Sequence, residues 1–200
     1  EEEGAALAKK LMGYFQGAIT DWTCEDQRWL RRAVPENRLH AYDMRHLINV
    51  FADTDSVVEL RPDFAPGMIT AFVRVEGRPL GLIANDPKVL GGAIDAAGAD
   101  KASRFMQLCD AFGVPMVSFC DTPGFMVGPE EEETAMVRHT CRMFVTAASL
   151  TVPLFSLVTR KGYGLGAQGM TGGSFHAPFF CASWPSGEFG GMGLEGAVNL

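Results

Sequence analysis

The second half of this sequence repeats one pattern: a helical segment ends at a proline-containing break, and a short apolar segment follows. From Asp95 to Phe112 the apolar residues fall on one helical face, and Gly113-Val114-Pro115 ends the helix. Met116 to Cys120 then reads as a buried strand. The pattern recurs as a helical segment from Glu130 to Leu150, a break at Thr151-Val152-Pro153 and an apolar strand from Leu154 to Thr159. This alternation predicts an α/β domain whose short parallel strands are buried by the helices between them.

Two more strands and a helix precede this repeat. Met68 to Val75 has the composition of a strand, and Glu76-Gly77 turns the chain into a second strand around Leu80 to Ala84. Upstream, Asp43 is placed to cap a helix that ends near Asp53. A unit of two strands and one helix therefore begins to repeat along the chain.

The first forty residues carry no recognisable chemistry. Gly4 to Phe15 has the apolar spacing of a helix, whereas Gln16 to Ala41 loses the pattern and is expected to be a connecting segment that packs locally. The chain begins with three glutamates rather than Met and ends on the largely apolar Gly196-Ala197-Val198-Asn199-Leu200. We interpret both ends as cuts in a longer polypeptide.

Composition excludes several classes of function. The 17 basic and 24 acidic residues give a net charge of −7, and the basic ones are scattered, so nucleic acid is not an expected partner. The five cysteines are odd in number and lack Cys-x-x-Cys spacing, which indicates buried thiols in a reducing compartment. The sequence has neither a membrane-length apolar stretch nor a secretory leader, and we expect a location in the cytoplasm or an organelle matrix.

Two predicted strands run directly into glycine-bearing segments. One is Asp121-Thr122-Pro123-Gly124-Phe125, and the other, Arg160 to Met170, has four glycines in eleven residues. Ligands in α/β folds commonly lie at the carboxyl ends of strands, and glycine lets backbone N–H groups turn toward a developing oxyanion. A tight strand-to-helix connection would also need glycine, so this feature alone does not decide the function. The sequence patterns of phosphate-binding and dinucleotide-binding loops are absent.

Other polar residues favour structural roles. Arg160 and Lys161 are expected to pair with acidic neighbours. The four acids Glu130 to Glu133 suit the positive end of a helix dipole better than a metal site, and no metal is expected. His139 and His176 lack a partner at triad or zinc spacing. Three methionines are assigned to packing: Met126, Met136 and Met143.

A series of short motifs in one order is far more specific for a protein family than any single motif. In chain order they are Asn85-Asp86-Pro87, Gly91-Gly92-Ala93-Ile94-Asp95, Ala99-Asp100-Lys101-Ala102, Arg104-Phe105, Asp121-Thr122-Pro123-Gly124-Phe125, Thr159-Arg160-Lys161, Tyr163-Gly164, Trp184-Pro185, Met192-Gly193 and Gly196-Ala197-Val198. With these motifs the chain resembles the C-terminal domain of the carboxyltransferase (beta) subunit of biotin-dependent acyl-CoA carboxylases, of the propionyl-, acetyl- and methylcrotonyl-CoA carboxylase type.

The resemblance implies an α/β, crotonase-like fold, a superhelix of repeated ββα units. The full subunit of this family carries two such domains in tandem. We therefore expect residues 1–41 to be a helix and connecting segment from the preceding half, and residues 42–200 to be the C-terminal, biotin-side domain, truncated at its C-terminus.

The implied activity is the transfer of a carboxyl group between carboxybiotin and the α-carbon of an acyl-CoA. In the family the site lies where the N-terminal domain of one subunit, holding the CoA ester, faces the C-terminal domain of another, holding biotin. This chain matches the biotin half and is expected to be inactive alone. Biotin must arrive on another domain or chain, because the sequence has no Met-Lys-Met. The implied partners are the acyl-CoA, a biotin carboxyl carrier domain, a biotin carboxylase subunit, the N-terminal carboxyltransferase domain and further copies in a hexamer.

The resemblance also implies where the catalytic N–H donors lie. By ungapped comparison, the pair for the ureido oxygen of biotin falls at Leu165 and Gly166, whereas a one-residue gap would select Gly166 and Ala167. Family members often read Tyr-Gly-Gly-Ala here, and this chain has an additional leucine in that run. The donors are backbone N–H groups, so the leucine side chain does not prevent this segment from binding the ureido oxygen in either alignment.

Two further sets of residues are assigned by the same resemblance. Gly124, Phe125 and Gly164 are expected to line the biotin pocket, with Phe125 as an apolar wall. Gln168 falls where an acidic residue in some family members helps to select the acyl chain, and with Gly169 beside it suggests a different or roomier acyl pocket.

Two alternative functions stay open at the level of sequence. A crotonase-type acyl-CoA hydratase or isomerase would need an acid or base beside its oxyanion donors, and no such constellation is identified. A non-catalytic assembly domain of a carboxylase complex would use its glycine-segment amides within secondary structure.

Overall fold

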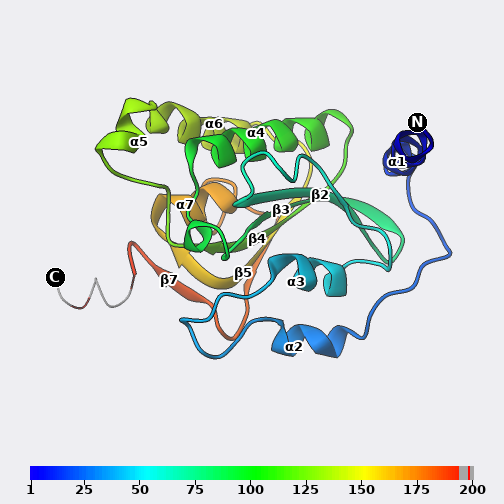
Figure 1. The fold of residues 1–200 in the computed structure, drawn as a ribbon, viewed down its shortest axis with the longest axis horizontal. Coiled ribbons are helices and arrows are strands. Elements are labelled where there is room, and N and C mark those ends of the chain that lie inside the picture. Colours follow the sequence, from blue (N-terminus) through cyan, green and yellow to red (C-terminus); the bar gives the residue numbers. More distant parts are fainter. Residues whose placement is uncertain (194–197, 199–200) are drawn as a thin grey trace.

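The chain folds as one mixed sheet with helices on both faces, in a computed structural model that describes residues 1–193 and 198 (Figure 1). The helices are α1 (Glu2–Gly13), α2 (Leu30–Ala33), α3 (Met44–Phe51), α4 (Ala96–Ala111), α5 (Pro129–Glu133), α6 (Met136–Ala148) and α7 (Gly164–Met170), with 3-10 turns η1 (Gln27–Trp29) and η2 (Leu90–Gly92). The strands are β1 (Val58–Glu59), β2 (Met68–Val75), β3 (Arg78–Asn85), β4 (Met116–Thr122), β5 (Leu154–Tyr163), β6 (Phe180–Ser183) and β7 (Glu188–Gly190). The architecture is α/β and crotonase-like, as predicted.

The sheet combines an antiparallel start with a parallel body. Its order is β1-β2-β3-β4-β5-β6, with β7 also paired to β5. Strands β1 to β3 are antiparallel, and β3 to β6 run parallel because α4, then α5–α6, and then the segment that contains α7 carry the chain back between them. The β2–β3 turn is the expected Glu76-Gly77, with φ values of 50° and 75°, the positive angles that a tight hairpin requires.

Each face of the sheet has its own hydrophobic core. On one face α4 and α6 lie over the strands, and α7 fills the space beside β4 and β5 (Figure 1). On the other face α3 packs against Ile69, Leu82 and Phe119. Strand β4 is buried at all of its positions, which explains why its sequence does not alternate between apolar and polar residues. Among the described residues, no helix is both long and apolar enough to cross a membrane.

Three segments differ from the sequence expectations. The single helix expected from Glu130 to Leu150 is divided into α5 and α6, because Ala135 adopts a left-handed conformation with φ 58°. Strand β5 extends past Thr159 to Tyr163, and the expected glycine loop is the end of this strand followed by α7. The 16–41 segment does not pack only locally, because the carbonyl of His40 accepts a hydrogen bond from Arg160.

A buried lysine joins α4 to the loop between β1 and β2. Lys101 is 2% exposed, and its ammonium group donates to the carbonyls of Arg61 and Phe64, both at 2.8 Å, and of Ala65 at 3.4 Å. Burial lowers the pKa of Lys101 to about 8, so the group is mostly charged at neutral pH. A buried ammonium is tolerated only where hydrogen bonds replace its hydration, as these carbonyls do.

We therefore expect Lys101→Met to lower the free energy of unfolding at pH 7 by about 2–4 kcal/mol, because two or more carbonyls lose their donor. Urea unfolding followed by tryptophan fluorescence measures the change. The matched control is Lys9→Met, at an exposed position on α1, which should stay within about 0.5 kcal/mol of the wild type. Equal effects of the two substitutions would contradict a structural role for the Lys101 ammonium.

Candidate functional site

The segments after β4 and β5 lie in direct backbone contact. A Cβ built on Gly166 would lie 2.6 Å from the carbonyl carbon of Gly124, so only glycine allows α7 to approach this turn. The Thr122 hydroxyl holds the turn by accepting from the Gly124 N–H at 3.1 Å and donating to its carbonyl at 3.0 Å. Ile94 braces it from outside, donating to the Gly124 carbonyl at 3.0 Å and accepting from the Met126 N–H at 2.8 Å. The two predicted glycine segments therefore form one structural unit.

Helix α7 begins immediately at the end of β5, with Tyr163 as its N-cap. In an α-helix the N-cap carbonyl accepts the first intrahelical bond, which employs the N–H of Ala167. The N–H groups of Gly164, Leu165 and Gly166 precede it and have no partner within the helix. Gly164 has a φ of 57°, and the Leu165 side chain is 62% exposed. The first turn of α7 thus begins beside the Gly124 turn, and N–H groups left without an intrahelical acceptor are suited to an anion.

A buried ion cluster lies beneath this unit. Asp121, at the end of β4, is fully buried, and its Oδ1 lies 3.1 Å from the Lys161 Nζ while its Oδ2 lies 3.2 Å from an Arg160 nitrogen. Oδ1 also accepts the backbone N–H of Lys161 at 3.1 Å, and the Asp121 N–H donates to the Asn85 side-chain oxygen. The predicted pairing of Arg160 and Lys161 with an acidic neighbour is confirmed.

The β4–β5 ladder is irregular at this cluster. Cys120 pairs with Val158, but the next pair is Thr122 with Gly162. Asp121 alone therefore faces the three residues 159–161 of β5, which form a bulge. This bulge brings both cationic side chains of β5 to one carboxylate.

Neighbouring hydroxyl and thiol groups lie against this cluster. The Thr159 hydroxyl donates to the Cys120 carbonyl at 3.1 Å and so accepts from the Tyr42 hydroxyl at 2.9 Å. The Arg160 guanidinium stacks 5.0 Å above the Tyr42 ring. Burial raises the pKa of Tyr42, with the Asp121 charge adding to the effect, and burial likewise raises the pKa of the Cys120 thiol. Neither group is placed to exchange protons near neutral pH.

Phe125 and Gly169 pack against each other on the interior side of α7. A Cβ on Gly169 would lie 3.1 Å from the Phe125 ring and 3.6 Å from Met143. The Phe125 ring is half-buried and meets Phe144 edge-on at 6.2 Å. The space beside Gly169 is therefore filled by Phe125 and Met143. Gln168, one residue earlier, is half-buried.

One polar cluster at this end of the sheet was not predicted from the sequence. The Tyr163 hydroxyl donates to the Glu188 carboxylate at 2.5 Å, and Arg38 contacts the same oxygen at 2.8 Å. Burial, followed by the nearby Glu188, raises the pKa of Tyr163. The three residues come from distant parts of the chain, and strand β7, which carries Glu188, was not predicted.

The methionines and His139, considered above as candidates, have packing or ion-pair roles in the structure. Met136 and Met143 are buried as predicted, and Met126 is half-buried. His139 has a carboxylate partner that its spacing did not reveal, since its Nδ1 lies 2.9 Å from Asp100 on α4, which also pairs with Arg142. Within the described part of the chain, no group of three or more His, Cys, Asp or Glu is arranged for a metal ion. Of the predicted motifs, Gly196 and Ala197 lie outside the described residues.

Together the fold and the paired glycine segments define a crotonase-like domain with an anion-suited turn at its strand ends. The carboxyl transferase domain family matches residues 1–200. The chain belongs to this family.

Several known carboxylases and carboxyltransferases are similar to this chain. A solved structure described as a single-chain, multi-domain long-chain acyl-CoA carboxylase is 58% identical, with a TM-score of 0.95, over 98% of this chain and 20% of that one. The methylmalonyl-CoA carboxyltransferase 12S subunit of Propionibacterium freudenreichii is 37% identical over 100% of this chain and 40% of its own. A propionyl-CoA carboxylase beta chain of Roseobacter denitrificans is 38% identical over 84% and 32%. The chain thus spans two fifths or less of these relatives.

The contact between α7 and the Gly124 turn predicts a large effect of one methyl group. Gly166→Ala should lower the free energy of unfolding by about 1–3 kcal/mol, because the added Cβ overlaps backbone atoms that cannot rotate away. Gly4→Ala is the matched control, since this helical glycine of α1 has no heavy atom within 4 Å of the added Cβ. It should be neutral or stabilising by up to about 1 kcal/mol. Urea unfolding of both variants tests the contact, and a neutral Gly166→Ala would contradict it.

Proposed function

We propose that the protein containing this chain transfers a carboxyl group between carboxybiotin and the α-carbon of an acyl-CoA, and that this chain supplies the biotin side of the site. The observation that carries the proposal is the first turn of α7, whose N–H groups lie beside the Gly124 turn in a chain of the carboxyl transferase family. Biotin, when carboxylated, supplies the carboxyl group and a ureido oxygen on which negative charge develops during transfer.

The chain's own contribution is a set of fixed donors. The N–H groups of Leu165 and Gly166 would donate to the ureido oxygen, and their fixed orientation avoids the cost of reorganising water around the developing charge. Helix geometry favours this pair over Gly166 and Ala167, because the Ala167 N–H is the first to be used within α7. Gly164 and Gly124 keep side chains away from the same turn, so a flat ring can approach the backbone.

Carboxyl transfer of this kind does not require a base on this chain. Asp121 is the carboxylate at the end of β4, and it is buried and engaged by two cations. This state argues against the hydratase or isomerase alternative, which needs an available acid or base. The named relatives are carboxylases and carboxyltransferases, which also disfavours a purely structural role.

We infer further that the substrate is a long-chain acyl-CoA. The relative that is 58% identical to this chain is described as a long-chain acyl-CoA carboxylase. The uncharged Gln168 at the predicted selectivity position fits an apolar acyl chain. Because Phe125 and Met143 fill the space beside Gly169, we assign the room for this chain to the surface facing the other domain.

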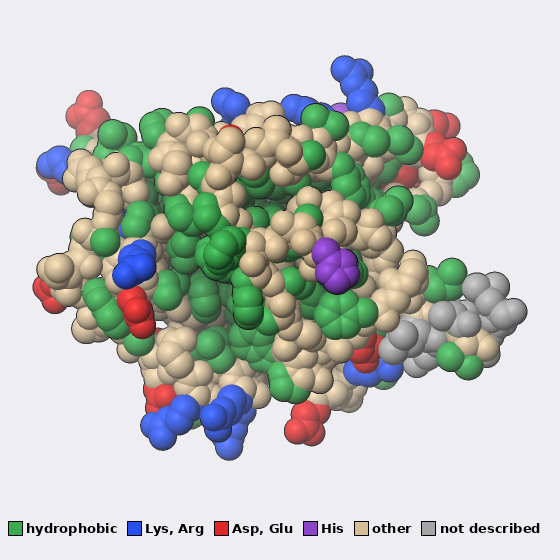
Figure 2. Space-filling view, turned by 180° about the vertical axis from the view of Figure 1, so that it is seen from behind, with side chains coloured by type: hydrophobic (Ala, Val, Ile, Leu, Met, Phe, Trp, Pro, Cys, Tyr) green, Lys and Arg blue, Asp and Glu red, His purple; other side chains and the backbone are tan. Residues whose placement is uncertain are grey.

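The proposed partners follow from the half-site. We propose that the N-terminal carboxyltransferase domain of another subunit covers the turn, that biotin arrives on a carrier domain loaded by a biotin carboxylase, and that copies assemble as a hexamer. One relative is described as a hexamer. Exposed apolar side chains on the described surface supply area for such contacts, namely Val137 and Val145 on α6, Leu165, and Phe179. Figure 2 shows hydrophobic side chains gathered in a hollow on the back of the molecule.

The direct test is carboxylation of acetyl-, propionyl- and long-chain acyl-CoA by the full-length protein with ATP, bicarbonate, a biotin carboxylase and its biotin carrier. We expect turnover that avidin abolishes and that is highest for the long-chain substrate. The 200-residue chain alone should be inactive, because it holds only one side of the site. Turnover by the isolated chain would refute the half-site, and turnover of short substrates only would refute the substrate assignment.

The donor assignment is tested by removing one N–H. Leu165→Pro deletes the proposed donor at a first-turn position, where a helix tolerates proline, and should lower kcat on the order of 100-fold. Leu165→Ala keeps the N–H and removes the exposed side chain, so it should retain most of the turnover. Thermal unfolding of both proteins establishes that they are folded. A folded Leu165→Pro protein with wild-type kcat would show that this amide is not a donor.

A further inference from the structure

We propose that Asp121, Arg160 and Lys161 form a positioning cluster that sets the first turn of α7 relative to the Gly124 turn. The inference rests on the proposed function, since it concerns the donors assigned there. None of the three residues is expected to touch the substrate. They act through the backbone to which they belong.

The bulge gives the cluster control over the end of β5. Between the pairs Cys120–Val158 and Thr122–Gly162 the β4–β5 ladder is interrupted, and the Lys161 N–H bonds to the Asp121 side-chain carboxylate. The side-chain carboxylate thereby replaces a backbone acceptor of the sheet. Only two residues, Gly162 and Tyr163, separate this bond from α7, so a shift at Asp121 passes directly to the helix start.

The same carboxylate fixes the other side of the site. Asp121 is separated from Gly124 by two residues, and the turn between them is closed by the Thr122 hydroxyl. Its backbone N–H is held by Asn85, which is fully buried at the end of β3. Asp121 therefore contacts the ends of three strands: it begins the first glycine segment, and it bonds to Arg160 and Lys161 at the start of the second.

Arg160 and Lys161 differ in burial and in their other contacts. Arg160 is 6% exposed at its side chain, stacks on Tyr42 and donates to the His40 carbonyl at 2.8 Å, which fixes the bulge from the opposite face. Lys161 is 22% exposed and lies three residues before Gly164. With one carboxylate and two cations, the cluster carries a surplus positive charge near the turn where negative charge is proposed to develop.

The contact between α7 and the Gly124 turn leaves no room for displacement. Gly166 and Gly124 already meet at backbone distance, so displacement of β5 alters the direction of the α7 N–H groups and does not simply compress a side chain. Misplacement by about 1 Å is enough to cost on the order of 100-fold in rate at a preorganised site.

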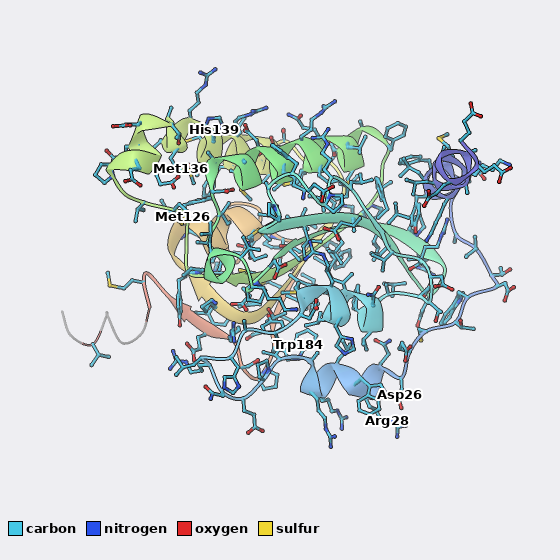
Figure 3. The ribbon with its side chains drawn as sticks, in the orientation of Figure 1. Asp26, Arg28, Met126, Met136, His139 and Trp184 are labelled. Atoms are coloured by element: carbon cyan, nitrogen blue, oxygen red, sulfur yellow. The ribbon has the colours of Figure 1, made fainter. Side chains whose placement is uncertain are left out.

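The test uses the full-length protein with Asp121→Asn, Lys161→Met and Lys161→Arg. The matched control is Arg28→Met, which removes the cation of the exposed Asp26–Arg28 pair (Figure 3). We expect Asp121→Asn and Lys161→Met to lower kcat on the order of 100-fold with little change in the KM for acyl-CoA, and Lys161→Arg to recover most of the loss. Arg28→Met should match the wild type. Lys161→Met is the milder variant should Asp121→Asn fail to fold.

Hydrogen exchange by mass spectrometry gives a readout independent of activity. Peptides that cover residues 160–168 should exchange at least about tenfold faster in Asp121→Asn and Lys161→Met than in the wild type or Arg28→Met. Unchanged exchange overturns the inference whatever the turnover. Faster exchange with wild-type kcat, or failure of Lys161→Arg to recover turnover, also overturns it. A wild-type protein that does not carboxylate acyl-CoA refutes the proposed function separately, because the exchange measurement still reports on the cluster.

Discussion

A charge buried at the end of a parallel strand organises this end of the molecule. A carboxylate with no exposure to water is tolerated only when cations and N–H donors replace its hydration, and Asp121 has a lysine, an arginine and a backbone N–H. Meeting that requirement forces a bulge in β5, because a regular ladder would place its side chains alternately on opposite faces. The bulge in turn decides where β5 ends and α7 begins. The geometry of the candidate site is therefore a consequence of how one carboxylate is neutralised.

The sequence predicted the elements whose signal is periodic and local. Strand β4 and the helix before it were found because apolar spacing, a Gly-Val-Pro break and an apolar run follow one another. The division of the helix at Ala135 was missed, since a left-handed alanine has no compositional signature and is imposed by packing. The extension of β5 was missed for a related reason. Arg160 and Lys161 are unfavourable in a central strand unless a buried acid pairs with them, and periodicity does not reveal that partner.

The sequence predicted which residues form the candidate site better than it predicted their backbone conformation. Motif order placed Gly124 and the glycines of α7 at neighbouring strand ends, and the structure brings them into contact. That the segment is helical could not be read from four glycines, because glycine is a poor helix former and only the contact with Gly124 explains Gly166. The partners in long-distance pairings were not identified from the sequence, as with Tyr163 and Glu188.

The buried ionisable groups at these strand ends are already paired. A chain of this kind can still serve a catalytic role, because its backbone can do the work. Carboxyl transfer needs stabilisation of charge that develops on the cofactor, and backbone N–H groups supply it without a titratable side chain. Such donors work only if they cannot rotate toward water, so they need a rigid support more than a reactive neighbour. Here the ionisable residues are used as that support. Asp121, Arg160 and Lys161 hold the backbone, burial keeps Tyr42 and Cys120 neutral, and the proposed anion donors are the backbone N–H groups of Leu165 and Gly166. Under the proposed function, such a half-site would catalyse carboxyl transfer only once a second domain brings the acyl group to it.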